Sequence, residues 1–187
     1  MTAPVALSAG EIRALLTELG RRLDEAGVEA TVYVVGGAAI ALELDRRRVT
    51  VDVDAVFHPA TTVRAQVVAM ARERDLPPNW LDDAVRPFLP GDPDDDIGSV
   101  KLDLPGISVA VASPRHLLAM KMAAYRPGLD QRDLEILFRV LEVVTPEQAA
   151  DIATAVYGEH SAVLPGRDEL VLSARAVFDR LGRGPSA

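Results

Sequence analysis

The order of elements around a pair of glycines constrains the fold of this chain more than any other feature. A short run of β-branched and aromatic residues, Val32–Val35, leads directly into Gly36-Gly37, and an apolar segment with helical character follows over Ala38–Leu44. From Val51 to Phe57 the sequence begins as apolar and acidic residues in alternation, which is the periodicity of a strand. The pattern predicts strand, glycine turn, short helix and second strand, and such an order is typical of a mixed α/β domain.

Helices are predicted on both sides of this stretch. Ser8 and Glu11 form a capping-box pattern ahead of apolar residues at helical spacing, and Gly27 ends that run. Pro105-Gly106 separates two short apolar runs and predicts a hairpin. The remaining predicted elements are a helix over Thr61–Arg74, a Pro- and Asp-rich loop over Asp82–Gly98, hairpin strands over Val100–Leu104 and Ile107–Ala112, and helices beginning at Ser113, Asp130, Thr145 and Arg167.

These elements predict an α/β (α+β) fold with a small mixed sheet and flanking helices. The mixed part covers residues 1–112, and an all-helical C-terminal part covers residues 113–187. We expect the helical part to form the other wall of a cleft.

Composition excludes several classes of protein. The 28 acidic residues exceed the 20 basic ones and give a net charge of -8, which excludes a general nucleic-acid coat but permits a local basic patch. The absence of cysteine excludes disulfide frameworks, thiolate zinc sites and cysteine nucleophiles. No apolar run approaches the roughly 20 residues of a membrane span, and Met1–Leu7 lacks the basic and apolar regions of a signal peptide. We therefore expect a cytoplasmic protein with no membrane partner.

Thr50, Asp52 and Asp54 are spaced two residues apart in the second predicted strand, so their side chains are expected on one face. Two neighbouring carboxylates repel each other unless a cation lies between them, and magnesium prefers one or two carboxylates plus substrate phosphates. Gly36 and Gly37 would leave backbone N–H groups open for a triphosphate at the start of the short helix. Together the residues predict a nucleotide–metal site. The alternative is an edge strand with one solvated face beside an ordinary turn.

A family resemblance is carried by two segments. The stretch VVGGAAIALELDRRRVTVDVDAVF resembles the signature of the nucleotidyltransferase superfamily, in which Gly-Gly or Gly-Ser precedes a strand bearing Asp-x-Asp. The later ASPRHLLAMKMAAYRPGLDQRDLEIL resembles the AbiEii and Men-type branch, the toxin nucleotidyltransferases of bacterial toxin–antitoxin systems. That branch pairs the Asp strand with a helix-borne Lys and a following Asp, and the matching positions here are Lys121, Ala124, Arg126, Asp130 and Asp133. Many members of the superfamily carry Ser at the position of Gly37, and Gln131-Arg132 departs from the last motif.

The resemblance implies transfer of a nucleoside monophosphate from a nucleoside triphosphate (NTP) to an acceptor, with release of pyrophosphate. Asp52 and Asp54 would hold Mg²⁺, and Lys121 would neutralise charge on the transferred group. Asp130 or Asp133 would orient or deprotonate the attacking hydroxyl, and the choice between them stays open. The implied acceptor is the tRNA 3′ end, which would make the protein the toxin of a toxin–antitoxin system. Men-type toxins are restrained by phosphorylation at the position of Thr50, which implies a cognate antitoxin with kinase activity as a partner.

Several residues have competing interpretations. Arg48 is a candidate for binding the triphosphate or an RNA backbone, although Arg46-Arg47-Arg48 also has the pattern of a solvated helix end. Lys121 on an apolar helix also fits a side chain that reaches along the surface to solvent. Asp103 is a candidate third carboxylate or a solvent-facing strand residue. Trp80 is expected in packing, with a stacking platform for a base as the alternative. Asp92, Asp94 and Asp96 are expected in a solvated loop, and His58, His116 and His160 are isolated and show no metal-ligand spacing.

Two other functions compete with the toxin hypothesis. One is a transferase acting on a protein (AMPylation) or on a small molecule such as an antibiotic. The other is a non-catalytic nucleotide-binding or antitoxin-like module that retains the site as scaffold.

Overall fold

The structure is a computed structural model and describes residues 6–182. Most of the Met1–Leu7 segment, for which the sequence predicts no signal peptide, lies outside this range. The described residues divide into two compact units. The first contains the residues up to Pro87 together with Ser99–Ala112, and the second contains Phe88–Gly98 together with the residues from Ser113 onward. None of the helices in the described range is long and apolar enough to span a membrane.

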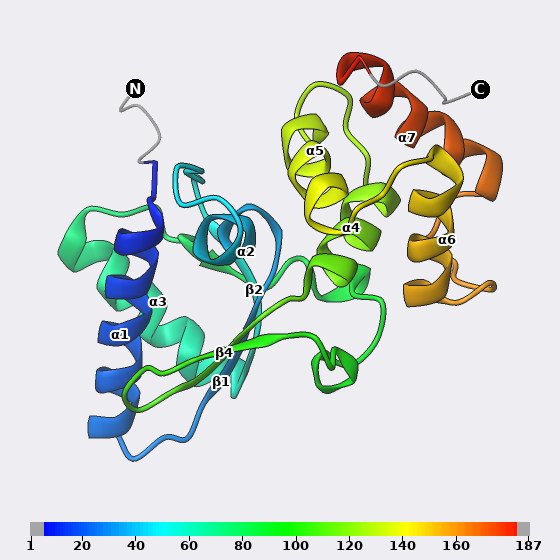
Figure 1. The fold of residues 1–187 in the computed structure, drawn as a ribbon. Coiled ribbons are helices and arrows are strands. Elements are labelled where there is room, and N and C mark those ends of the chain that lie inside the picture. The colour runs from blue at the N-terminus through cyan, green and yellow to red at the C-terminus, as the bar shows by residue number, and fades with distance from the viewer. Residues whose placement is uncertain (1–5, 183–187) are drawn as a thin grey trace. The chain divides into compact units, whose positions relative to one another are not determined.

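The first unit is built on a mixed five-stranded sheet with the order β3-β2-β1-β5-β4 (Figure 1). The central strand β1 pairs antiparallel with β2 and parallel with β5. β3 pairs parallel with β2, and β4 pairs antiparallel with β5 to form the predicted hairpin. The strands are β1 (Thr31–Val34), β2 (Val53–His58), β3 (Leu81–Asp82), β4 (Val100–Leu102) and β5 (Ser108–Val111).

Three helices pack with this sheet: α1 (Ala9–Glu25), α2 (Gly36–Glu43) and α3 (Ala60–Arg74). The predicted capping box at the start of α1 is confirmed, since Ser8 N donates to Glu11 Oε2 over 2.7 Å while Ser8 Oγ accepts from Glu11 N over 3.4 Å. α2 is short because it lies between the glycine turn and the polar residues after Leu44, and its interior positions are buried alanine, isoleucine and leucine.

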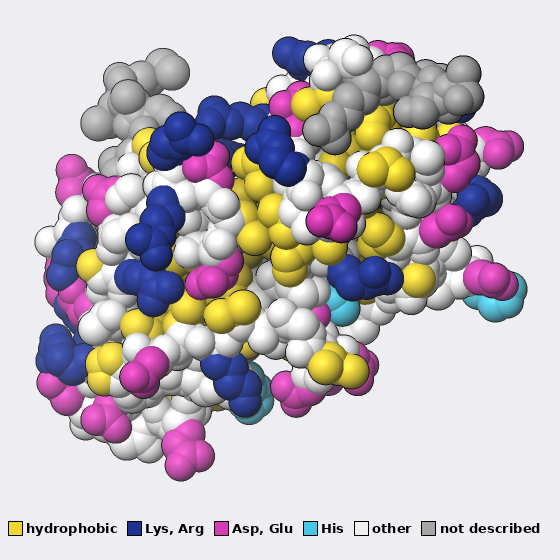
Figure 2. Space-filling view, viewed as in Figure 1, with side chains coloured by type: hydrophobic (Ala, Val, Ile, Leu, Met, Phe, Trp, Pro, Cys, Tyr) yellow, Lys and Arg dark blue, Asp and Glu magenta, His cyan; other side chains and the backbone are white. Residues whose placement is uncertain are grey.

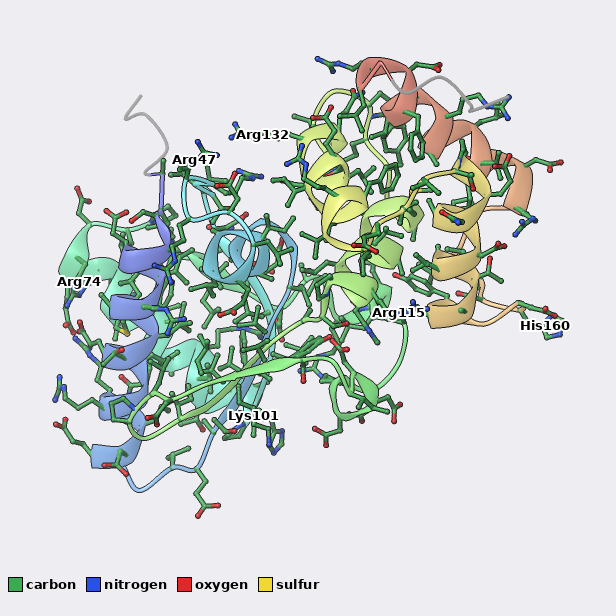
Figure 3. The ribbon with its side chains drawn as sticks, in the orientation of Figure 1. Arg47, Arg74, Lys101, Arg115, Arg132 and His160 are labelled. Carbon is green, nitrogen blue, oxygen red and sulfur yellow. The ribbon has the colours of Figure 1, made fainter. Side chains whose placement is uncertain are left out.

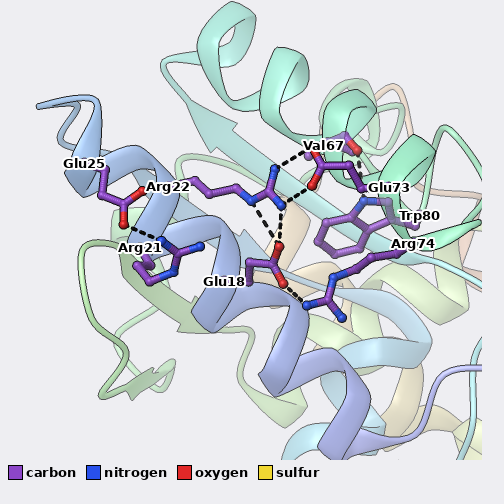
Figure 4. Close-up of polar contacts among 8 residues, drawn as sticks. All are labelled: Glu18, Arg21, Arg22, Glu25, Val67, Glu73, Arg74 and Trp80. Atoms are coloured by element: carbon purple, nitrogen blue, oxygen red, sulfur yellow. Dashed lines mark hydrogen bonds and ion pairs between the residues drawn. The ribbon is translucent and has the colours of Figure 1, made fainter.

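A charged network joins α1 to α3 (Figure 4). Arg22 bonds both Glu18 on its own helix and Glu73 on α3, and Arg74 bonds Glu18 from the other side. Burial alone would raise the pKa of Glu18, but the hydrogen bonds from Arg22 and Arg74 outweigh it and lower that pKa. Beneath this network the fully buried Trp80 donates from Nε1 to Val67 O over 3.2 Å, which confirms its predicted packing role.

The second strand begins later than the sequence predicts. Thr50 forms an isolated antiparallel bridge with Leu7, in which Leu7 N donates to Thr50 O over 2.6 Å and Thr50 N donates to Leu7 O over 3.0 Å. The chain then bends at Val51 and Asp52, and β2 starts at Val53. The prediction that Thr50, Asp52 and Asp54 share one face of a continuous strand is therefore wrong, because pairing with Leu7 takes Thr50 out of the sheet.

The second unit contains four helices in its described part, with α6 packed against both α4 and α7. Phe138 and Phe178 stack with ring centroids 5.0 Å apart and join α5 to α7. Two of the predicted helix starts are confirmed, because the Ser113 and Thr145 side chains each accept a hydrogen bond from a backbone N–H in the first turn of the helix that they cap. The helices are α4 (Pro114–Ala123), α5 (Gln131–Val140), α6 (Pro146–Tyr157) and α7 (Arg167–Arg180).

The segment Phe88–Gly98, which the sequence-based division places with residues 1–112, packs in the second unit. Tyr157 Oη donates to Phe88 O over 2.6 Å at one end. At the other end Ser113 N donates to Asp96 Oδ2 over 2.7 Å, and His116 Nδ1 lies 3.0 Å from Asp96 Oδ1. The expected long loop over residues 82–98 thus includes part of β3, and short 3-10 turns at Arg86–Phe88 and Pro93–Asp95.

Candidate nucleotide site

Gly36 lies at the point where β1 turns into α2, directly below the carboxylate of Asp54. Its φ of +62° is a left-handed conformation that favours glycine. A Cβ added to Gly36 would lie 2.7 Å from Asp54 Oδ2, closer than real side chains approach. Val35 N donates to Asp54 O over 2.9 Å, which fixes the start of β2 beside the turn. Glycine is therefore required here both by backbone conformation and by the position of the carboxylate.

Gly37 contacts two further residues that the sequence singled out. A Cβ added to Gly37 would lie 3.2 Å from Thr50 Oγ1 and 3.3 Å from Arg48 Nη2. Arg48 also donates from Nη1 to Val49 O, which holds its side chain along the loop. Two backbone hydrogen bonds to Leu7 fix the position of the Thr50 backbone beside the glycine turn. The structure thus brings Gly36, Gly37, Arg48, Thr50 and Asp54 together at the N-terminus of α2, and we call these five residues the glycine cradle.

The chemistry of the glycine cradle is suited to a phosphate group. Backbone N–H groups in the first turn of a helix have no intrahelical acceptor, and the helix dipole favours an anion there. Arg48 adds a guanidinium group that binds phosphate oxygens well. Asp54 places negative charge at the same point, and a bare anion would be repelled by it. A phosphate that carries a divalent cation satisfies both groups.

Asp52 and Asp54 have donor atoms that fit magnesium. Both side chains are partly exposed, with Asp52 at the bend before β2 and Asp54 on the strand. Within residues 6–182 no group of three or more His, Asp or Glu side chains is placed to hold a metal ion. Two carboxylates leave several coordination positions for water and phosphate oxygens, which is the arrangement that magnesium prefers. The residues present therefore fit a nucleotide-bound Mg²⁺ better than a metal held by protein ligands alone.

Asp103 does not lie at the end of the sheet that carries the glycine cradle. It follows the end of β4 and is exposed, next to the hairpin turn. Val111 of β5 pairs with Val34 of β1, next to the glycine turn, and with Val100 at the start of β4. Leu102 at the end of β4 pairs with Val109, which lies two residues further from that turn. Asp103 therefore lies toward the opposite end of the strands from Asp54, and the interpretation as a solvent-facing residue is the better one.

In the second unit, Lys121 lies between two buried aspartates. Its Nζ is 2.7 Å from Asp130 Oδ1 and 3.0 Å from Asp133 Oδ2, and both carboxylates are 1% exposed as residues. The Lys121 side chain itself is only 12% exposed. A lysine that merely reaches along the surface to solvent would place its ammonium group in water, so that interpretation does not describe Lys121.

Asp130 is the most heavily bonded carboxylate of this group. It accepts hydrogen bonds from Arg126 N, Nε and Nη2 at 2.9, 3.0 and 3.0 Å in addition to the bond from Lys121. Burial alone would raise its pKa, but the bonds from Arg126 and Lys121 outweigh burial and lower the pKa below its usual value. A carboxylate with four donors and a lowered pKa is a poor proton acceptor, so its main effect is to hold Lys121 and Arg126 in place.

One buried polar cluster could not be predicted from the sequence. Asp96, expected in a solvated loop, is 3% exposed and bonds Ser113 and His116, which was expected to be isolated. Both expectations are wrong, because the loop folds back onto the first turn of α4. Asp96 and Ser113 are far apart in the chain, and no motif spacing links them. Since Ser113 Oγ and Asp96 both approach Nδ1 of His116, the cluster lacks the geometry of a Ser-His-Asp triad.

Comparisons with known proteins bear on the fold. No protein-family model and no curated protein matches the sequence. The crystal structure of an antigenic nucleotidyltransferase-like protein from Paracoccidioides brasiliensis has a similar chain path, with a TM-score of 0.51. The similarity covers 98% of this chain and 97% of that chain at 17% sequence identity. The fold is nucleotidyltransferase-like. This agrees with the superfamily resemblance of the first segment, whereas the AbiEii and Men-type branch stays a prediction.

Proposed function

We propose that this protein is an NTP-dependent nucleotidyltransferase. The observation that carries the proposal is the glycine cradle, where the Asp54 carboxylate, the Thr50 hydroxyl and the Arg48 guanidinium converge on two glycines at a helix N-terminus. This combination supports binding of a metal-bound triphosphate, as argued above. The nucleotidyltransferase-like fold supports the same reaction class.

In the proposed reaction an acceptor hydroxyl oxygen attacks the α-phosphorus of the nucleotide. A new oxygen–phosphorus bond forms, the bond from the α-phosphorus to the bridging oxygen breaks, and pyrophosphate leaves. Asp52 and Asp54 would hold Mg²⁺, which supplies positive charge for the phosphate oxygens. Arg48 and the N–H groups of the cradle would orient the triphosphate, and glycine at both positions lets it approach the backbone.

The resemblance also assigns Lys121, Asp130 and Asp133 to the reaction. Their contacts within the second unit support a division of these roles. Asp130, with its four donors, is proposed to position Lys121, which leaves Asp133 as the better candidate to orient the acceptor hydroxyl. Lys121 is proposed to neutralise charge on the transferred group.

The acceptor proposed from the family resemblance is the tRNA 3′ end, and the biological role is that of a toxin with a cognate antitoxin. Transfer to a protein or a small molecule is the competing activity, and a non-catalytic nucleotide-binding module is the second alternative. A short assay distinguishes them. The purified protein is incubated with Mg²⁺ and each of the four α-labelled NTPs, together with total tRNA, a protein extract, a small-molecule extract or no acceptor.

Label on tRNA supports the proposed acceptor, and label on protein supports AMPylation or a related modification. Asp54→Asn serves as the control that must lose the signal, because a contaminating transferase would be unaffected by that change. Absence of label on any acceptor, combined with measurable nucleotide binding, would overturn the enzymatic assignment and favour the non-catalytic module.

A further inference from the structure

The second unit contains a cavity beside the first turn of α4. Its volume is about 410 Å³, which is within the range of sites that hold small molecules. Its walls come from residues 95–98, the start of α4, the residue after α5 and the last turn of α6, all of which belong to the second unit. We call it the α4 cavity. None of its residues is assigned to the proposed nucleotidyl transfer, so an inference drawn from it does not depend on that function.

Much of the wall of the α4 cavity is apolar. Leu141 and Val156 contribute aliphatic side chains, and Pro114 contributes its ring. Ile97 also lines the cavity, yet it is 98% exposed, more than any other large apolar residue in the described range. Removing such a side chain from water is favourable. The wall therefore suits the apolar part of a ligand.

A buried carboxylate orients the histidine that lines this cavity. The ionised Asp96 carboxylate can only accept hydrogen bonds, so its 3.0 Å contact with His116 Nδ1 places a proton on that nitrogen. Ser113 N also donates to Asp96, which fixes the carboxylate in place. In the neutral imidazole Nε2 is then a hydrogen-bond acceptor, and it has no partner within residues 6–182. His116 therefore has one unused acceptor at the cavity.

Two side chains of opposite charge line the same cavity. Arg115 and Asp95 are both exposed, and within the described residues neither side chain forms an ion pair or a hydrogen bond. They therefore lie too far apart to neutralise each other. Figure 3 shows Arg115 beside the start of α4 and near the end of α6. Figure 2 shows histidine, basic and apolar side chains next to one another on this part of the second unit. A ligand that carries charges of both signs would complement both residues.

From this arrangement we propose that the α4 cavity binds a free α-amino acid with an apolar side chain, such as phenylalanine. The ligand carboxylate pairs with Arg115, and the ligand ammonium group donates to Asp95 and to Nε2 of His116. The ligand side chain packs on Leu141 and Val156. A ligand with only a negative charge would leave Asp95 without a partner, and one with only a positive charge would do the same to Arg115. Because the bound amino acid contacts several segments, it stabilises the second unit.

Three matched compounds separate the contributions of the two charges. L-phenylalanine carries both charges, hydrocinnamate lacks the ammonium group, and phenethylamine lacks the carboxylate. Each compound is titrated into the full-length protein at neutral pH. Shifts of the backbone amide signals in NMR spectra measure the affinity, and thermal unfolding measures the stabilisation.

The test variants are Arg115→Gln and Asp95→Asn, and both positions are exposed, so neither substitution disturbs the packing of the core. The matched controls are Arg139→Gln on α5 and Asp94→Asn, next to Asp95 in the chain. Both control residues are exposed and do not line the cavity.

We expect saturable binding of L-phenylalanine and a rise in the melting temperature. Hydrocinnamate and phenethylamine should each bind at least about tenfold more weakly, because each lacks one charged group that pairs with the protein. Arg115→Gln should weaken binding of phenylalanine by about tenfold and leave that of phenethylamine unchanged. Asp95→Asn should weaken binding of phenylalanine to a similar extent and leave that of hydrocinnamate unchanged. The two control variants should stay within about twofold of the unsubstituted protein.

Three results would overturn the inference. The first is the absence of saturable phenylalanine binding. The second is equal affinity for phenylalanine and for either of its singly charged analogues. The third is an equal loss of affinity in a test variant and its matched control, because binding would then depend on overall charge and not on the α4 cavity.

Discussion

The Asp54 carboxylate occupies the space directly over Gly36 that a side chain at Gly36 would need. A Cβ at Gly36 would come within 2.7 Å of Asp54 Oδ2, and the residue has a φ of +62°. The backbone conformation at Gly36 and the position of the Asp54 carboxylate therefore both require that residue 36 has no Cβ atom. A single methyl group at this position tests both.

Gly36→Ala is expected to lower the free energy of unfolding by about 1–2 kcal/mol, because alanine is strained at positive φ. It should also displace the Asp54 carboxylate and weaken binding of a metal-bound nucleotide by at least about tenfold, which corresponds to about 1.4 kcal/mol. Urea unfolding and nucleotide titration measure the two effects. Gly10→Ala is the control, since Gly10 lies in α1 with no atom within 4 Å of an added Cβ. Its stability should stay the same or rise, and Gly36→Ala with wild-type nucleotide affinity would contradict the cradle.

Asp52→Asn and Asp54→Asn should each abolish nucleotide transfer, because an amide replaces a charged metal ligand with a neutral one. Both side chains are partly exposed, so the free energy of unfolding should change by less than about 1 kcal/mol. Asp103→Asn, at the other end of the strands, should retain transfer. Wild-type activity in Asp52→Asn would remove that residue from the metal site and leave Asp54 as its sole protein carboxylate.

Lys121→Met should destabilise the protein as well as inactivate it. The substitution leaves Asp130 and Asp133 buried with one partner fewer, and breaking such a pair costs about 3–5 kcal/mol. Adding Asp133→Asn removes one of the two buried negative charges, so the double variant should be more stable than Lys121→Met alone. If Lys121 acts on the transferred group, Lys121→Met stays inactive under conditions in which it is folded, and the double variant serves as the comparison for stability alone. Transfer by folded Lys121→Met at the rate of the unsubstituted protein would show that Lys121 has only a structural role.

Asp130 should make the stability of the protein depend on pH. Its folded-state pKa is lowered because the bonds from Arg126 and Lys121 outweigh burial, so the unfolded chain binds its proton more readily. The stabilisation is therefore full above the usual carboxyl pKa, and it declines as the pH falls below about 5 toward the lowered folded value. Urea unfolding of the unsubstituted protein and Asp130→Asn should show a stability difference that shrinks from pH 7 to pH 3.5. A constant difference would mean that Asp130 titrates alike in both states.

Much of the fold could be predicted because many of its helix starts and turns are specified by residues that are neighbours in the sequence. The capping box at Ser8, the glycine turn after β1 and the hairpin around Pro105-Gly106 each depend on neighbouring residues. The start of β2 could not be predicted in this way. The alternation of apolar and acidic residues favoured a strand from Val51. Thr50 instead pairs with Leu7, which is distant in the sequence, and β2 begins only at Val53. Long-range pairing outweighed the local pattern there.

The candidate site shows the same division. Motif spacing identified Gly36, Gly37 and Asp54, and the structure brings them together with Arg48 and Thr50. Spacing did not reveal that Lys121 is sequestered between Asp130 and Asp133, because the sequence shows neither burial nor the direction of a side chain. It also left undetermined that the Arg48 side chain reaches Gly37, since this depends on the turn between Asp45 and Arg48.

Charge at Thr50 should control the glycine cradle. The Thr50 hydroxyl lies beside Gly37, and two hydrogen bonds to Leu7 hold the Thr50 backbone in place whatever side chain stands at this position. A phosphate on Thr50 would add about -1.5 to -2 charge at the helix N-terminus where the triphosphate is proposed to bind. It would occupy the same donors and attract Arg48, which is how a partner kinase would silence the enzyme. Thr50→Glu should therefore lower nucleotide affinity and transfer by at least about tenfold, corresponding to about 1.4 kcal/mol. Thr50→Ser should retain most activity, and Thr50→Val, which removes the hydroxyl without adding charge, should lose less activity than Thr50→Glu. Nucleotide titration and the labelled-transfer assay measure the series, and Thr50→Glu with near wild-type values in both would show that charge at this position does not govern the site.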